Sequence, residues 1–238
     1  SGASDGDVAG ALNAINSAES IVTNKIHPND VVATGINGQY TTTELYEAVN
    51  DTIVLIKVYT TVNHNDYYSY YDYYFGYSDP DDYKENEEKE PVFSGYGSGV
   101  VFTEDGYILT NAHVVDGAEK LVVVVNDYND AGTTYEYEAN VVGSDASTDI
   151  AVVKISRDEP FVAAKIGDSD SLKVGQDVCA IGNPGVTGDV MFEHTLTKGI
   201  ISGLNRVSLS EGYSLSLIQT DTAINSGNSG GGLFNDDG

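Results

Sequence analysis

Cysteine, tryptophan and basic side chains are scarce in this chain of 238 residues, which has one cysteine, no tryptophan and 11 lysines and arginines. A single cysteine cannot form an internal disulfide. Cys179 lies within an apolar run, where a cysteine usually packs as a small buried hydrophobe. No glycine turn or helix start surrounds it, which argues against a catalytic thiol. Because many envelope proteins lack disulfides, the scarcity of cysteine leaves secretion open.

Long apolar runs and cofactor motifs are also missing. No stretch reaches the length of a membrane-spanning helix, and no signal peptide begins the sequence, so we expect any leader or membrane anchor to lie outside it. The glycines of 95–99 precede an apparent strand and not a helix, which excludes a dinucleotide-binding fingerprint. Histidine and cysteine form no cluster with metal-ligand spacing. The sequence therefore predicts a protein that uses no cofactor and no metal.

The charge is strongly one-sided, with 37 acidic against 11 basic side chains and a net charge of −26. Such a surface repels phosphate backbones, so nucleic acid is excluded as a partner. It attracts cationic segments, or it serves only to keep the protein soluble. Much of the acidity lies in a tyrosine-rich stretch at 65–91. That stretch reads either as a disordered, solvated insertion or as an adhesive or regulatory arm.

The residues that are plentiful predict a mostly β protein. Twenty-six glycines and 17 tyrosines accompany short β-branched runs at 53–58 and 120–125, as expected of many strands joined by turns. Two helices are predicted near the start, over 7–25 and from Thr43 to Val49 with Thr43 as its cap. Between them, 31–40 has the pattern of a short strand and turn.

Three residues suggest nucleophilic catalysis. Ser229 lies in a glycine-flanked turn, while His113 and Asp149 each lie at the junction of a turn and an apolar run. A serine hydroxyl needs an imidazole to take its proton, and a carboxylate fixes the tautomer of that imidazole. The chain order His, Asp, Ser is that of the two-barrel serine proteases.

Together with their neighbours, these residues resemble the HtrA (Deg) serine proteases of the trypsin-like clan. The resemblance covers about residues 51–238, and its most specific block surrounds Ser229. The matching blocks are residues 97–115, 148–152, 181–184, 197–202 and 218–231.

The resemblance implies a role for each site residue. His113 would be the general base, Asp149 would orient it, and Ser229 would attack the scissile carbonyl. The backbone amides of Gly227 and Ser229 would form the oxyanion hole, and glycines at 227 and 230 permit the sharp bend that this needs. Ile224 would line the primary substrate pocket and favour small or medium aliphatic side chains.

The implied fold is a trypsin-like double six-stranded β-barrel, with the second barrel incomplete at the C-terminus and short helices at the N-terminus. We expect an N-terminal helical and extended segment over 1–50, a first barrel over 51–165 and a second barrel over 166–238. The insertion at 65–91 would interrupt the first barrel, and no PDZ domain is present in this chain.

The implied function is an HtrA-type serine endopeptidase that cleaves unfolded or misfolded proteins through an acyl-enzyme, in a bacterial cell envelope or after secretion. Many relatives form trimers through N-terminal residues, so a homotrimer is left open. The competing interpretation is a catalytically silent, chaperone-like or adhesive module that binds through the tyrosine-rich stretch. A third alternative, an esterase, would use the same chemistry but usually has another chain order.

Overall fold

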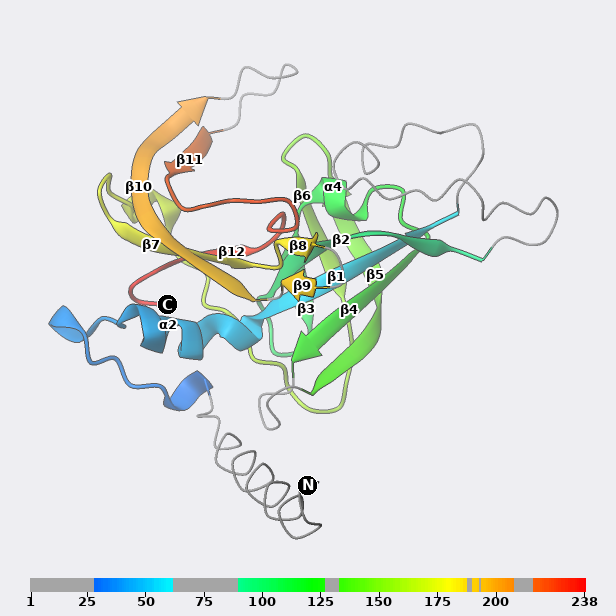
Figure 1. The fold of residues 1–238 in the computed structure, drawn as a ribbon, viewed down its shortest axis with the longest axis horizontal. Helices are drawn as coiled ribbons and strands as arrows, with labels where there is room; N and C mark the ends of the chain where they lie inside the picture. The colour runs from blue at the N-terminus through cyan, green and yellow to red at the C-terminus, as the bar shows by residue number, and fades with distance from the viewer. Residues whose placement is uncertain (1–27, 62–89, 127–132, 188–189, 193, 208–215) are drawn as a thin grey trace, which may run out of the picture.

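The structure is a computed structural model, and it describes residues 28–61, 90–126, 133–187, 190–192, 194–207 and 216–238. Two β units lie side by side, with an N-terminal helix beneath the second (Figure 1). The helix predicted over 7–25 and nearly all of the predicted insertion at 65–91 lie outside the described residues.

The first unit is a closed barrel of six strands in the order β1-β2-β3-β6-β5-β4. All of its strand pairs are antiparallel, and β1 lies between β2 and β4. The strands are β1 (Ile53–Thr60), β2 (Val92–Val101), β3 (Tyr107–Thr110), β4 (Lys120–Asn126), β5 (Thr134–Asp145) and β6 (Ile150–Lys154), with the short helix α4 (Ala112–Val115) between β3 and β4.

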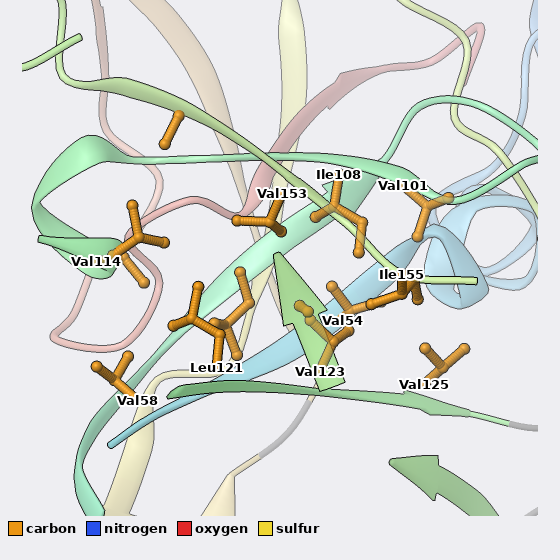
Figure 2. Packing of buried hydrophobic residues seen from close by; sticks show 14 of the residues in the cluster. Val54, Val58, Val101, Ile108, Val114, Leu121, Val123, Val125, Val153 and Ile155 are labelled. Carbon is orange, nitrogen blue, oxygen red and sulfur yellow. The ribbon is translucent and has the colours of Figure 1, made fainter. Parts of the chain in front are cut away.

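The first half of strand β1 is buried on both faces, which explains its run of four apolar residues at 53–56. Val54, Ile56 and Val58 alternate toward the barrel interior, where they pack with valines and isoleucines from the other strands (Figure 2). Ile53 and Leu55 point the other way into separate clusters. Full burial of such side chains stabilises a fold by roughly 1.5–3 kcal/mol each. The barrel is therefore a rigid support for the loops at its rim.

The second unit is a curled four-stranded sheet in the order β11-β10-β7-β12. This arrangement confirms the predicted mostly β fold, with one closed barrel and a second that is partial. Its strands are β7 (Asp177–Gly182), β10 (Thr195–Val207), β11 (Ser216–Thr220) and β12 (Gly232–Asn235), and a separate hairpin of β8 (Gly185–Thr187) and β9 (Val190–Phe192) joins β7 to β10.

Helix α2 (Thr42–Val49) packs against this second sheet. Its buried residues Leu45 and Val49 share a cluster with Cys179 of β7 and Phe234 of β12. The predicted cap was wrong by two positions. Thr41 caps the helix because its side chain accepts from the Glu44 amide while the Glu44 carboxylate accepts from the Thr41 amide, forming a capping box.

The predicted strand within 31–40 was also wrong. This segment contains a single turn of 3-10 helix, η2 (Ile36–Gly38), in which Asn37 adopts a positive φ of 62°. Tyr40, the last residue of the segment 31–40, contacts the end of the chain. Its amide donates to the Asp236 carbonyl at 2.8 Å. The remaining 3-10 turns are η1 (Pro28–Asp30), η3 (Asn50–Thr52) and η4 (Ser169–Ser171).

Candidate active site

His113 is held at the barrel rim by its neighbours in α4. Ala112, Val114 and Val115 are buried, so the single helical turn is fixed against the barrel core. The side chain of His113 is left 37% exposed on the outer face. The Asn111 side chain, directly before this turn, donates to the Asp149 carbonyl at 2.9 Å and ties the two loops together.

Asp149 ends a tight turn that leads into β6. It adopts a φ of 54°, in the left-handed region that Asp tolerates better than most residues. The preceding turn is closed by Asp145, whose carboxylate accepts from the Ser147 amide at 2.8 Å and from the Ser147 hydroxyl at 2.6 Å. These hydrogen bonds from Ser147 lower the pKa of the Asp145 carboxyl. The ionised Asp145 carboxylate thus closes the turn that precedes Asp149.

The structure brings His113 and Asp149 into direct contact. The Asp149 carboxylate accepts the His113 backbone amide at 3.0 Å, and its oxygens lie 2.8 and 3.0 Å from His113 Nδ1. A carboxylate only accepts, so Nδ1 carries the proton and the lone pair lies on Nε2. The imidazole is therefore oriented as a base, with Nε2 directed away from Asp149.

Ser229 occupies a turn that two glycines make possible. Gly227 and Gly230 adopt φ values of 91° and 85°. A Cβ at Gly230 would lie 2.1 Å from the Ser98 carbonyl oxygen and 2.3 Å from the Thr110 hydroxyl, so only glycine fits. This confirms the prediction that glycines at 227 and 230 permit a sharp bend.

Strand β2 contacts both the Ser229 turn and the loop that carries His113, and so connects them. The Ser98 amide donates to the Ser229 carbonyl at 2.8 Å. The Ser98 carbonyl accepts at 2.7 Å from the hydroxyl of Thr110, which stands three residues before His113. A Cβ at Gly97 would lie within 2.8 Å of Val114 and 3.3 Å of the Ser229 carbonyl oxygen. All three predicted catalytic residues are therefore at one end of the barrel.

The backbone amides of Gly227 and Ser229 donate no hydrogen bond to any group in the described part of the chain. Two such donors, one on the serine itself and one two residues before it, are what an oxyanion hole requires. Ile224, the predicted pocket residue, is 60% exposed in the loop that precedes the turn.

Other chemistries find less support among the described residues. Cys179 is fully buried between β10 and β12, and burial raises the pKa of its thiol. No group of three metal-ligating side chains occurs in the ranges given above. Within the same ranges, no helix is long and apolar enough to cross a membrane.

The sequence predicted no role for four residues that support the site: Asn111, Asp145, Ser98 and Asn183. The Asp-x-Ser pattern at 145–147 is a recognisable turn signal. Ser98 contacts Ser229, and the buried Asn183 donates from its side chain to the Val54 carbonyl at 2.9 Å. Both contacts join residues far apart in the sequence, for which no local signal exists.

Comparison with known proteins defines the class. A sequence profile of the trypsin-like peptidase domain matches residues 97–238, which is more than half of the chain and includes the histidine, aspartate and serine loops. The chain therefore belongs to the trypsin-like peptidase family.

Within this class the chain is similar to HtrA-type proteases, as its sequence blocks predicted. It is 49% identical over 142 residues to a probable periplasmic serine endoprotease DegP-like of Halomonas elongata, matching 60% of this chain and 27% of that protein. It is 46% identical over 160 residues to the serine protease Do-like HtrA of Bacillus subtilis, covering 64% and 34%.

A solved structure agrees with these relatives. The HtrA-type protease AlgW with tripeptide superposes with a TM-score of 0.58 and 31% identity, over 79% of this chain and 48% of that one. The chain spans about a quarter to a third of the length of the curated relatives named above.

Proposed function

We propose that this protein is a serine endopeptidase in which Ser229 is the nucleophile, His113 the general base and Asp149 the residue that orients the base. The observation that carries the proposal is the paired contact of Asp149 with the amide and Nδ1 of His113, at the same end of the barrel as the Ser229 turn. The imidazole is held in the tautomer that can accept a proton from serine.

The reaction follows from this arrangement. Ser229 Oγ attacks the scissile carbonyl carbon as its proton passes to His113 Nε2, and the resulting imidazolium is stabilised by the Asp149 carboxylate. The imidazolium then protonates the leaving amine, the C–N bond breaks, and an acyl-enzyme remains. Water, activated by the same imidazole, hydrolyses the ester and restores the Ser229 hydroxyl.

The amides of Gly227 and Ser229 are proposed to bind the oxyanion. Neither is engaged elsewhere in the described residues, and Gly227 is buried, where a hydrogen bond to a developing charge is worth more than in water. Loss of one such donor typically lowers turnover by about two to three orders of magnitude.

We propose unfolded or misfolded polypeptides as substrates, as the resemblance to HtrA proteases implies. We also propose an extracytoplasmic location, which is supported by relatives named probable periplasmic serine endoproteases. Ile224 is proposed to favour small or medium aliphatic residues before the cleaved bond; no carboxylate is expected there to bind Arg or Lys. A trimer, and domain boundaries near 50 and 165, belong to the same proposal.

The test compares hydrolysis of an unfolded protein, such as reduced casein, with that of the same mass of a stable folded protein. Cleavage of the unfolded substrate alone, abolished in Ser229→Ala, supports the proposal. Binding without hydrolysis would favour the chaperone-like alternative, and hydrolysis of small esters but of no peptide would favour an esterase.

A further inference from the structure

Ser98 of β2 lies at the centre of a buried polar network between the two β units. It is fully buried, yet each of its polar atoms has a partner. Its amide donates to the Ser229 carbonyl at 2.8 Å, and its carbonyl accepts from the Thr110 hydroxyl at 2.7 Å. Its hydroxyl lies 2.8 Å from both the Gly227 carbonyl and the Asn183 amide. Ser98 therefore contacts the nucleophile turn at two backbone positions.

The direction of each hydrogen bond is fixed. The Asn183 amide can only donate and the Gly227 carbonyl can only accept. The Ser98 hydroxyl must therefore accept from Asn183 and donate to Gly227. Without this hydroxyl, the Gly227 carbonyl would lose a donor, and the Asn183 backbone amide and side-chain Nδ2, which lies 3.3 Å away, would lose an acceptor.

Asn183 holds the network from the side of the second sheet. It is fully buried directly after β7, and its side-chain amide donates to the Val54 carbonyl of β1 at 2.9 Å. Its side-chain oxygen accepts the His194 amide at 2.9 Å. The His194 carbonyl in turn accepts from Tyr46 of helix α2 at 3.0 Å. The hydroxyl of Ser98 is thereby fixed to both β units and, through Tyr46, to the N-terminal helix.

We propose that Ser98 is a positioning residue for the oxyanion hole, an inference that rests on the proposed peptidase function. Gly227 adopts a φ of 91°, and as a glycine it has no side chain to restrict its backbone. Hydrogen bonds to the carbonyls of Gly227 and Ser229 restrain the turn at two backbone positions. The Ser229 amide lies between these anchors, and the Gly227 amide belongs to the residue that carries the first anchor. Ser98 acts through these amides and does not contact the substrate.

The test compares Ser98→Ala with Thr52→Val. Thr52 is a matched control because its buried hydroxyl also donates to a carbonyl, that of Val49, at 2.6 Å and away from the site. Ser98→Ala should lower kcat roughly tenfold to a hundredfold, less than the loss of an oxyanion donor itself. KM should change little, and binding of a peptide boronic acid should weaken in proportion to kcat/KM. Thr52→Val should leave all three near wild type.

Hydrogen exchange over residues 225–232 gives a readout that does not need activity. Ser98→Ala should accelerate exchange there and Thr52→Val should not. If Ser98→Ala does not fold, Ser98→Cys fills the same space with a weaker donor and should give an intermediate effect on kcat and exchange. Wild-type protein without any hydrolysis contradicts the proposed function. Equal exchange and equal kcat in the Ser98 and Thr52 variants contradict the positioning role.

Discussion

The Asp149 carboxylate accepts two hydrogen bonds from the same residue, one from the His113 amide at 3.0 Å and one from His113 Nδ1 at 2.8 Å. The first fixes the carboxylate relative to the helix start, and the second fixes the ring relative to the carboxylate. Orientation and tautomer of the imidazole are thus set by one side chain, although the two side chains are 37% and 41% exposed.

Asp149→Asn should lower kcat by about four orders of magnitude, because an amide can donate to Nδ1 and stabilise the wrong tautomer of His113. Steady-state kinetics on a peptide substrate measure the effect. Asp158→Asn, which removes a charge at an exposed position, is the control and should leave kcat unchanged. A kcat for Asp149→Asn close to that of the control would remove Asp149 from the mechanism.

Gly230→Ala should abolish activity and destabilise the fold by more than about 3 kcal/mol, because its Cβ would meet the Ser98 carbonyl oxygen at 2.1 Å. Gly117→Ala separates this clash from backbone strain. Gly117 has a φ of 68° and open space around a Cβ, so only the left-handed penalty of about 1–2 kcal/mol should appear. Urea unfolding of both variants measures the difference, and equal losses would show that the close approach to Ser98 does not matter.

The Glu44 capping box should make stability depend on pH. The Glu44 carboxylate accepts hydrogen bonds from the Thr34 hydroxyl and from the Thr41 and Thr34 amides. These bonds lower the pKa of Glu44 from 4.5 to about 2. A depressed folded pKa gives stability that is present above pH 4.5 and lost as pH falls toward 2. Glu44→Gln should therefore be less stable than wild type at pH 6, with the gap closing below pH 4.5.

Urea midpoints of wild type and Glu44→Gln between pH 6 and pH 2.5 test this dependence, and both proteins carry the same remaining titratable groups. A difference that stays constant across this range would mean that the carboxylate charge contributes nothing to the cap.

Cys179 should react with iodoacetamide only after unfolding, because it is buried beneath α2 and burial raises the pKa of its thiol. Mass spectrometry should show alkylation at least roughly ten times faster in denaturant than in buffer. Hydrolysis should survive treatment of the native protein. Rapid native alkylation with loss of activity would reopen a role for the thiol.

The sequence predicted those parts of the fold and site that depend on local pattern. The β-branched run at 53–58 indicated strand β1, and the glycines around Ser229 indicated a bend. Even the missed cap was encoded, since only Thr41 stands three residues before Glu44 in the run of three threonines, as a capping box requires.

Other features could not be predicted locally. Val31 and Val32 favour a strand by propensity, but no strand among the described residues pairs with them, and η2 forms later in the segment. The contacts of Ser98 with Gly227 and of Asn183 with Val54 each join residues 129 positions apart. They exist only once both β units have folded.

In the proposed function, Ser229 is a nucleophile activated by His113. The most direct measurement is intact-mass analysis of the native protein after treatment with a fluorophosphonate, beside Ser229→Ala and heat-denatured wild type. We expect one adduct per chain in native wild type, mapped to Ser229, and none in either control. Native wild type without an adduct, or an adduct that persists in Ser229→Ala, would contradict it.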